Sequence, residues 1–353
     1  MARLKSRACT SRLARASKLA SAGGRALADA LPSFCEPLGD SLWAIDTGFH
    51  RDRFDAAYLA VDSGRAAFID TGTAFAVPRL LASLDALGLA RSAVDFVIAT
   101  HVHLDHAGGV GQLMRALPDA QLIVHPRGAR HMIDPGALWQ GALAVYGAAQ
   151  MERAYGTLLP VDASRVRTTT DGETIHLAGR PLLFAHTPGH ALHHHCIWDA
   201  RSAGWFTGDN FGMAYPEFNV DGRAFIFPTT TPVQFDPDAM RASIARLLAA
   251  SPRQMFLTHY SRVTDVADCA ARLEGMLDAT VAVALAHRGV PDRLALLTTA
   301  LMQLYGDGAR AFGVTLPDAE IDALLLDDAA LNAAGLIAWL DRPNRQPATP
   351  SPA

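Results

Sequence analysis

The stretch THVHLDHAGG, residues 100–109, carries three histidines and one aspartate within six positions. It continues the apolar segment VDFVIAT, which predicts a buried strand. His101 and His103 lie two residues apart, so they can face the same side of an extended strand end. Polar side chains are costly to bury without partners, and a divalent cation would satisfy imidazoles and a carboxylate held this close. The stretch therefore predicts a metal site where a strand ends.

The same arrangement recurs three times downstream, each time as an apolar strand followed by small residues and a ligand-type side chain. TPGH places His190 after PLLFAHT, TGD places Asp209 after GWF, and LTH places His259 after MF. Each instance is weak by itself, because loops at strand ends often carry polar residues. Their ordered combination predicts one site assembled from four strand ends.

Short strand-like and helix-like stretches alternate from about residue 38 onward, which predicts an α/β fold built in layers. SLWAIDTG, AAYLAVDSG and RAAFIDTGT read as successive strands, and VPRLLASLDALG as an amphipathic helix. Residues 137–156, ALWQGALAVYGAAQMERAYG, read as one longer helical stretch. Residues 318–342 read as two amphipathic helices with acidic residues at their starts.

Four segments are predicted along the chain. Residues 1–37 form a basic N-terminal arm expected to be disordered, and residues 38–262 form the catalytic domain. Residues 263–342 form a helical extension packed on the core, with a lid or a dimerisation surface as alternatives. Residues 343–353 form a Pro-rich tail that is also expected to be disordered.

Composition limits the classes of function. The chain has 353 residues and a net charge of −4, but residues 1–28 hold seven of its 31 basic residues and none of its 35 acidic ones. The remaining acidic body argues against nucleic acid as the main partner. The arm itself fits a disordered leader, a helix on an anionic surface or a transit peptide.

No stretch of about 18 apolar residues free of charge appears, so no membrane span is predicted. Four cysteines are scattered without close pairs, which favours reduced thiols and a cytoplasmic location.

The ordered set HxHxDH, GH, GD and a single H at a strand end resembles the metallo-β-lactamase superfamily. Within that superfamily, the motif HVHLDHAGG is similar to the motif of lactonases and of glyoxalase II. The resemblance covers approximately residues 38–263, including FIDTG at 68–72. It implies a four-layer αββα sandwich with a binuclear metal site at one edge. Carried over by position, the first metal would be held by His101, His103 and His190, and the second by Asp105, His106 and His259, with Asp209 bridging.

The metals implied are two divalent cations, zinc being expected and iron or manganese the alternatives. They would lower the pKa of a shared water and generate a hydroxide nucleophile. Asp105 would orient that nucleophile and take its proton, and Tyr260 could help to hold an oxyanion. Asp70 and His186 are predicted to support the ligand histidines. Substrate contacts are predicted for four residues of the loop after Asp209, namely Tyr215, Glu217, Asn219 and Phe225, and for His194, which precedes Asp209.

The predicted activity is hydrolysis of a small ester-like bond, a thioester or a lactone, in a small-molecule substrate. A phosphodiesterase is the nearest alternative, because a two-metal site also handles phosphoryl oxygens. An iron-dependent enzyme resembling persulfide dioxygenases or flavo-diiron proteins is a second alternative, and a non-catalytic binding protein a third. A homodimer is possible on the sequence alone.

Overall fold

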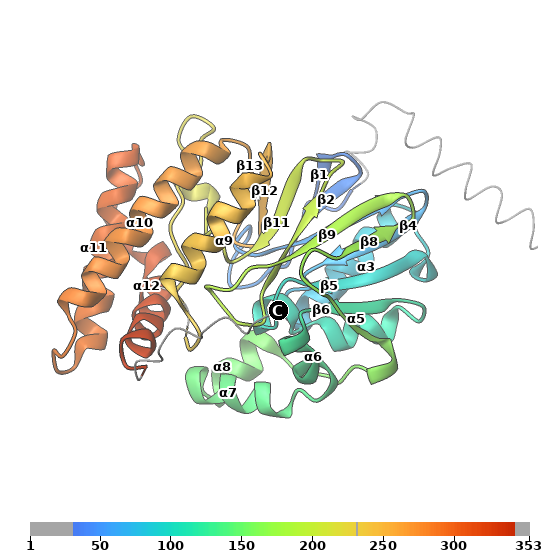
Figure 1. The fold of residues 1–353 in the computed structure, drawn as a ribbon, viewed down its shortest axis with the longest axis horizontal. Helices are drawn as coiled ribbons and strands as arrows, with labels where there is room; N and C mark the ends of the chain where they lie inside the picture. The colour runs from blue at the N-terminus through green and yellow to red at the C-terminus, as the bar shows by residue number, and fades with distance from the viewer. Residues whose placement is uncertain (1–30, 231, 343–353) are drawn as a thin grey trace, which may run out of the picture.

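The computed structural model describes residues 31–230 and 232–342. Two sheets lie face to face within this part of the chain, and helices cover their outer faces (Figure 1). The predicted four-layer αββα sandwich is therefore confirmed. The predictions for most of the basic arm and for the C-terminal tail fall outside the described residues.

The first sheet has seven strands in chain order, β1 to β7. Its first four strands pair antiparallel, and β4 to β7 pair parallel. The strands are β1 (Cys35–Gly39), β2 (Leu42–Asp46), β3 (Ala56–Asp62), β4 (Arg65–Ile69), β5 (Val94–Ala99), β6 (Gln121–Val124) and β7 (Val166–Thr168). Because β1 begins at Cys35 and pairs with β2, the ordered sheet starts before the boundary predicted at residue 38.

The second sheet has six strands in the order β13-β12-β11-β10-β9-β8. They are β8 (Thr174–Leu177), β9 (Arg180–His186), β10 (His195–Asp199), β11 (Gly204–Gly208), β12 (Gln254–Leu257) and β13 (Ser261–Val263). β10 runs antiparallel to both β9 and β11, and β11 runs parallel to β12. The carboxyl ends of β9, β11 and β12 therefore meet at one edge of this sheet.

Alternation along the strands builds the core between the sheets. In β3, Tyr58 and Ala60 face the second sheet, whereas Ala57 and Leu59 face the helices outside. The ring of Tyr58 packs edge-on against Phe206 of the second sheet, and its hydroxyl donates a hydrogen bond to the carbonyl of Leu257. The two sheets are thus joined by apolar packing and by a polar contact.

Amphipathic helices cover both outer faces. α3 (Val77–Ala86) and α5 (Val110–Ala116) pack on the first sheet, and α9 (Pro237–Ala249) packs on the second. The start of α9 is fixed locally, because Asp236 accepts hydrogen bonds from the backbone N–H groups of Asp238 and Ala239. Two short helices, α4 (Leu104–Ala107) and α6 (Pro126–Ile133), follow the ends of β5 and β6.

The chain after β13 is helical, as predicted. α10 (Val266–Ala286), α11 (Arg293–Phe312) and α12 (Asp318–Leu340) gather at one side of the sandwich (Figure 1, orange to red) and share an apolar cluster with its second sheet. The prediction of two helices in the last segment is wrong. α12 is one continuous helix, because the segment consists largely of alanine and leucine and contains no proline.

The helical stretch predicted for residues 137–156 is confirmed, but it is interrupted. α7 (Gly136–Tyr146) ends at Gly147, whose φ of +77° is a conformation that glycine adopts readily. The short α8 (Ala148–Gln150) and a π-helical turn (Met151–Tyr155) follow. The break folds this segment into a hairpin-like projection below the sandwich (Figure 1).

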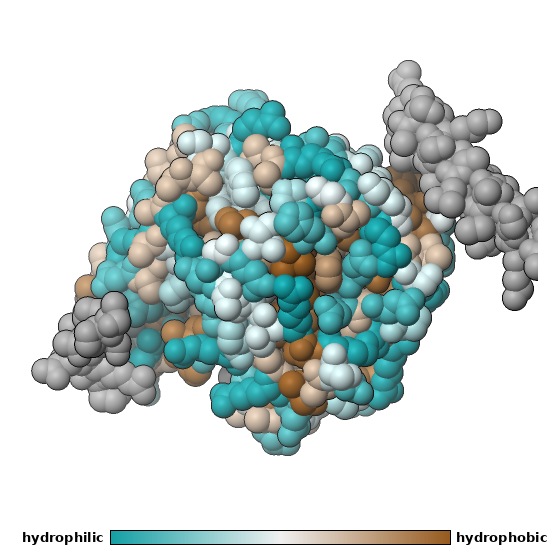
Figure 2. Space-filling model, turned by 45° about the vertical axis from the view of Figure 1, so that its right-hand side comes forward, coloured by the Kyte–Doolittle hydropathy of each residue, from teal (hydrophilic) through white to brown (hydrophobic). Residues whose placement is uncertain are grey.

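Polar residues make up most of the face drawn in Figure 2, with apolar side chains visible between them. Among the described residues, α12 is one helix long and apolar enough to cross a membrane by length and composition alone. Core helices of other proteins pass the same test, and α12 packs in the cluster it shares with α10 and α11.

Candidate metal centre

The four predicted strand ends converge at one edge of the sandwich. His101 follows β5, and His103 is the residue before α4, so that Asp105 and His106 fall in the first turn of that helix. His190, Asp209 and His259 follow β9, β11 and β12, the strands whose carboxyl ends share an edge. The topology thus brings together side chains that are up to 158 positions apart in the sequence.

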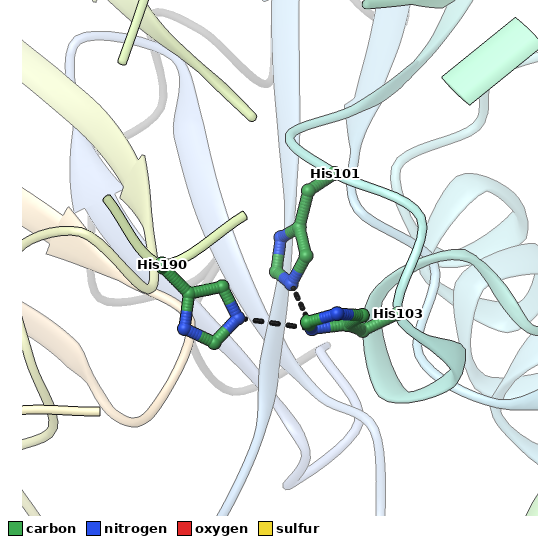
Figure 3. Close-up of side chains that lie close together, drawn as sticks. All are labelled: His101, His103 and His190. Carbon is green, nitrogen blue, oxygen red and sulfur yellow. Dashed lines mark hydrogen bonds between the residues drawn. The ribbon is translucent and has the colours of Figure 1, made fainter. Parts of the chain in front are cut away.

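One group of ligand-type atoms consists of three imidazole nitrogens. The Nδ1 atom of His103 lies 2.9 Å from Nε2 of His101 and 2.9 Å from Nε2 of His190. Figure 3 shows the three rings pointing toward one another, His101 and His103 from one segment and His190 from another. All three nitrogens therefore face a common point, as three ligands of one cation would.

Two further groups share members with each other, one containing His101, His106 and Asp209 and the other Asp105, His106 and His259. Asp209 reaches toward both sides. Its Oδ2 atom lies 3.4 Å from Nε2 of His190, and its Oδ1 atom lies 3.0 Å from Nε2 of His106 and 3.5 Å from Nε2 of His259. This is the position that a bridging carboxylate requires.

Partners on the far side of three rings leave the Nε2 lone pairs available. Thr100 Oγ1 donates to Asp70, so at 3.2 Å it can accept from Nδ1 of His101. Thr229 Oγ1 donates to the carbonyl of Asp209, so at 2.8 Å it can accept from Nδ1 of His190. Nδ1 of His106 lies 2.8 Å from the carboxylate of Asp70. Fixing the proton on Nδ1 in this way is how outer partners orient metal-binding histidines.

Charge in the cluster also fits a cation. Burial lowers the pKa of His190 to about 3, so this ring is a neutral donor at physiological pH. Burial also disfavours the charged form of His259, but the carboxylates of Asp209, Asp55 and Asp105 outweigh it and raise its pKa to about 9. The carboxylates thus require positive charge beside them, which either protons or bound cations can supply.

Three buried atoms of the cluster lack a hydrogen-bonding partner, namely Nδ1 of His259, Nε2 of His106 and Oδ1 of Asp209. The last two lie 3.0 Å apart without forming a hydrogen bond. Unsatisfied buried polar groups are rare and costly, and a divalent cation between them would satisfy both. The residues present therefore fit a binuclear metal site.

Asp70 holds the supporting position predicted for it. Its carboxylate contacts His106 and accepts hydrogen bonds from the backbone N–H of Thr100 and from Oγ1 of Thr258, at 2.8 and 3.0 Å. Asp70 itself has a φ of +56°, a conformation in which Asp is enriched. One carboxylate therefore connects the ends of β4, β5 and β12.

His186 does not hold the predicted supporting position. Its ring centroid lies 4.2 Å from that of His125, and its Nε2 atom lies 3.4 Å from Oγ1 of Thr169. These contacts lie on the first-sheet side of β9, away from the ligand groups. Thr229 and Asn210 support His190 instead, Asn210 by accepting a hydrogen bond from its backbone N–H at 3.1 Å. The position of Asn210 directly after the GD pair was the available sequence signal, whereas Thr229 carries none.

A cavity of about 500 Å³ opens onto the cluster and is lined in part by His103, Asp105, Asp209 and His259. Its other walls come from the loop between β2 and β3, from α6 and α7, from Thr229 and residues 232–234, and from α12. The structure thus places a substrate-sized space directly beside the predicted ligands.

None of the residues predicted to contact substrate is among the described residues that line this cavity. Tyr215 and Phe225 are fully buried in the cluster that α10–α12 share with the second sheet. Glu217 pairs with Arg51 at 3.0 Å, and Asn219 is exposed. The aromatic middle of the loop after Asp209 packs inward against the C-terminal helices, whereas residues at its two ends, Met213 and Thr229, line the cavity.

His194 lies behind the cluster, where its Nδ1 and Oγ1 of Thr187 are 2.9 Å apart and its Nε2 accepts from the backbone N–H of Asp209 at 3.3 Å. The neighbouring His193 lines the cavity instead. Gly208 allows this packing, because its φ is +48° and a Cβ there would lie 2.5 Å from Nε2 of His194. The glycine of the GD pair thus lets His194 support the bridging aspartate.

Tyr260 also faces away from the cavity. Its ring belongs to the core between the sheets, and the guanidinium of Arg53 lies 5.5 Å from the ring centroid. Burial raises the pKa of its hydroxyl to about 12. The predicted oxyanion role is therefore wrong.

Comparison with known proteins agrees with this arrangement. The family model described as the metallo-beta-lactamase superfamily matches residues 50–259, more than half of the chain. A metallo-beta-lactamase fold-containing protein of Sulfurisphaera tokodaii is 28% identical over 170 residues, which is 47% of this chain and 60% of that protein.

Two relatives carry names that point to different chemistry. A type A flavoprotein of Rhodobacter capsulatus is 31% identical over 172 residues, 48% of this chain and 33% of its own. An atrochrysone carboxyl ACP thioesterase of Aspergillus fumigatus is 26% identical over 174 residues, 49% of this chain and 29% of its own. The matches thus span less than two thirds of the length of these curated relatives.

Two solved structures share the fold over most of both chains. An archaeal metallo-beta-lactamase superfamily protein from Sulfolobus tokodaii superposes with a TM-score of 0.57 at 21% identity, covering 84% of this chain and 98% of its own. A metallo-beta-lactamase family protein from Thermus thermophilus superposes with a TM-score of 0.58 at 19% identity, covering 87% and 91%. The family model matches residues 50–259, and the paired sheets and the ligand cluster agree with that match. The chain therefore belongs to the metallo-beta-lactamase superfamily.

Proposed function

We propose that the protein is a metal-dependent hydrolase that cleaves a small ester-like bond, a thioester or a lactone, with zinc as the preferred metal. The observation that carries the proposal is the convergence of seven histidine and aspartate side chains, four of which form the floor of a substrate-sized cavity. Imidazole nitrogens together with carboxylate oxygens form a donor set that suits zinc and also iron or manganese.

Two divalent cations held by these residues would acidify a water molecule and polarise the carbonyl oxygen of a substrate. The protein's own contribution is to orient the reactants and to move a proton. Asp105 is the carboxylate best placed for the proton, because its side chain is 23% exposed whereas that of Asp209 is 5% exposed. It lines the cavity, and its Oδ2 atom lies 3.5 Å from Nε2 of His259. Asp105 would therefore hold the attacking water and accept its proton.

Support for an ester-like substrate comes from the remaining walls of the cavity. They carry apolar side chains such as Leu138, Met213 and Leu331, which suit an acyl group, and no lysine or arginine among the described residues. Phosphodiesters are disfavoured, because their recognition needs positive charge beyond the metals. The relative named as an ACP thioesterase supports a thioester, although the match covers 29% of its length.

The test is hydrolysis by protein loaded separately with zinc, manganese or iron, with three substrates: an acyl thioester, a lactone and bis-p-nitrophenyl phosphate. We expect the thioester or the lactone to be cleaved with zinc and the phosphodiester to be cleaved least. Fastest turnover of the phosphodiester would contradict the proposal. No turnover of any substrate by fully loaded protein would favour a binding protein.

An iron-dependent oxidoreductase is the second candidate, favoured by the relative named as a type A flavoprotein. Metal analysis of protein purified without added metal separates the two. Two zinc ions per chain support the hydrolase. Two iron ions per chain together with metal-dependent oxygen consumption would support the oxidoreductase.

A further inference from the structure

The charge of the cavity is unbalanced. Four aspartates line it, and none of its described lining residues is lysine or arginine. Asp105 and Asp209 belong to the candidate metal groups, where bound cations would neutralise them. Asp327 and Asp328 belong to α12, on a different wall, and are not part of any described metal-ligand group. This second pair of carboxylates, which we name the α12 pair, has no role in the chemistry proposed above.

Asp328 is directed into the cavity with an unused oxygen. The residue is 7% exposed and lines the cavity. The hydroxyl of Tyr215 donates to its Oδ2 atom at 2.9 Å, and its Oδ1 atom has no hydrogen-bonding partner among the described residues. Burial raises the pKa of this carboxyl to about 6, so it is largely ionised at neutral pH, at an energetic cost that a positive ligand would relieve.

The neighbouring Asp327 is exposed and has no hydrogen bond or ion pair within the described part of the chain. The nearby cation, Arg51, forms no ion pair with Asp327 or Asp328, although its charge acts on Asp328 from a distance. Its guanidinium pairs with Glu217 at 3.0 Å and stacks over the rings of Phe54 and Tyr215, at 4.6 and 4.3 Å from their centroids. Arg51 is thus engaged in packing and is not a lining residue of the cavity.

Aromatic rings line another part of the same cavity. Phe49 lies 4.1 Å from His50, 5.9 Å from Phe54 and 5.4 Å from Tyr155, measured between ring centroids, and all four line the space. Aromatic faces attract cations, and quaternary ammonium groups are commonly bound by such rings together with carboxylates. Two independent features of the cavity, its rings and its free carboxylates, therefore favour the same kind of ligand.

We propose that the α12 pair and the aromatic rings bind a positively charged arm, an amine or a quaternary ammonium group, of an ester or thioester whose scissile carbonyl lies at the metal cluster. This inference rests on the proposed hydrolase function for the position of the carbonyl. It adds that the two ends of the cavity have opposite electrostatic preferences. A developing negative charge is stabilised at the loaded metal cluster, and a fixed positive charge is stabilised at α12.

The test compares three butyrate esters that differ in the charge of one arm. They are the ester of choline, that of its uncharged isostere 3,3-dimethylbutanol, and that of 3-hydroxypropanoate. With the metal-loaded protein we expect kcat/KM for the choline ester to exceed that for the uncharged ester on the order of tenfold, and the anionic ester to be cleaved least. An uncharged or anionic ester cleaved as well as the choline ester would overturn the proposal.

The affinities of the protein for choline and for 3,3-dimethylbutanol, measured by calorimetry, test the preference of the α12 pair for a positive charge without any bond cleavage. Asp327→Asn and Asp328→Asn should each reduce the preference for choline several-fold, whereas Asp322→Asn, an exposed position of α12 outside the cavity, should leave it unchanged. Asp327 is exposed, so its variant keeps the test decisive if Asp328→Asn fails to fold.

These measurements separate the two proposals. Preferential binding of choline without hydrolysis of any ester would contradict the hydrolase and leave the α12 pair as a cation site. Equal hydrolysis of the choline and uncharged esters would leave the hydrolase and overturn the role of the α12 pair. A preference for choline that persists in Asp327→Asn and Asp328→Asn would also overturn it.

Discussion

The floor of the cavity and its α12 wall differ in how their residues are marked in the sequence. The floor consists of side chains that directly follow strands and stand in short motifs such as HVHLDH and TPGH. The wall consists of Asp327, Asp328 and Asn332 in the middle of a long apolar helix, with no motif around them. The chemistry of the site is thus encoded locally, whereas its selectivity depends on where a distant helix packs.

Hydrogen bonds connect the two regions. Asn332 accepts from the backbone N–H of Thr230 at 2.6 Å and donates to the carbonyl of Pro228 at 2.9 Å. Between these two residues lies Thr229, whose hydroxyl contacts both His190 and the carbonyl of Asp209. α12 therefore holds the loop that supports the floor, so substitutions in the two regions should differ in kind and in size.

The largest effect is expected on the floor, from His103→Ala. Nδ1 of His103 faces the nitrogens of both His101 and His190, so its loss opens one metal position. Activity on the best substrate should fall by more than about a hundredfold, because even outer partners of metal ligands cost 10- to 100-fold. Metal content by elemental analysis should fall with it, and full activity with unchanged metal content would refute the ligand assignment.

Asp70→Asn tests the support beneath the floor. Asparagine tolerates the left-handed backbone at this position, so the change removes charge and one acceptor without straining the chain. Metal affinity should fall roughly 10- to 100-fold, because His106 loses the carboxylate that orients it. Competition with a chromophoric chelator measures this loss. Unchanged affinity would show that Thr100 and Thr258 suffice to hold the strand ends.

Asn332→Ala tests the connection between wall and floor. The substitution leaves the buried backbone N–H of Thr230 and the buried carbonyl of Pro228 without a partner. Each unsatisfied group lowers the free energy of unfolding by about 1–3 kcal/mol. Denaturant unfolding should show a stability loss of about 3 kcal/mol. Asn219→Ala, at an exposed position, serves as the matched control and should change stability little.

Asp328→Asn tests the charge of the wall through pH. Burial raises the pKa of Asp328 from 3.8 to about 6, so the folded protein binds the proton more tightly than the unfolded chain does. Stability is therefore lost as pH rises from about 4 to 6, by about 3 kcal/mol for two pKa units. The variant lacks this loss, so its stability relative to wild type should improve between pH 4 and pH 7 in urea titrations. A difference that does not vary with pH would contradict the buried carboxylate.

The smallest effect is expected from Tyr260→Phe. The ring faces Arg53 and the core between the sheets, so the hydroxyl is remote from the cavity. The value of kcat/KM should stay within about twofold of wild type, since no interaction with the transition state is removed. A hundredfold loss would restore the oxyanion role that the sequence had suggested.

Much of the floor was predictable from sequence because each ligand is tied to the end of a strand by a few neighbouring residues. The direction in which each of two neighbouring side chains points was not predictable. His193 faces the cavity and His194 supports Asp209, and only the register of the turn between β9 and β10 sets which of the two points where. Tyr260 was misassigned for a similar reason, since it lies in the turn between β12 and β13, and the shape of that turn sets where its ring points.

In the loop after Asp209, whose two ends do line the cavity, the individual contact residues were misassigned for a different reason. The aromatic residues of this loop suit a substrate pocket as well as a core, and composition does not separate the two. The presence of α10–α12 above them makes Tyr215 and Phe225 core residues, and it places α12 against the cavity.

By itself, the sequence determined the layered sandwich and the set of metal-ligating side chains, because periodicity and short motifs act over a few residues. The tertiary structure decided which walls surround the metal cluster and what charge they carry. Those properties depend on contacts between segments more than a hundred positions apart, such as Tyr215 with Asp328 and Thr230 with Asn332. No local pattern records such pairs, because packing of the C-terminal helices brings them together.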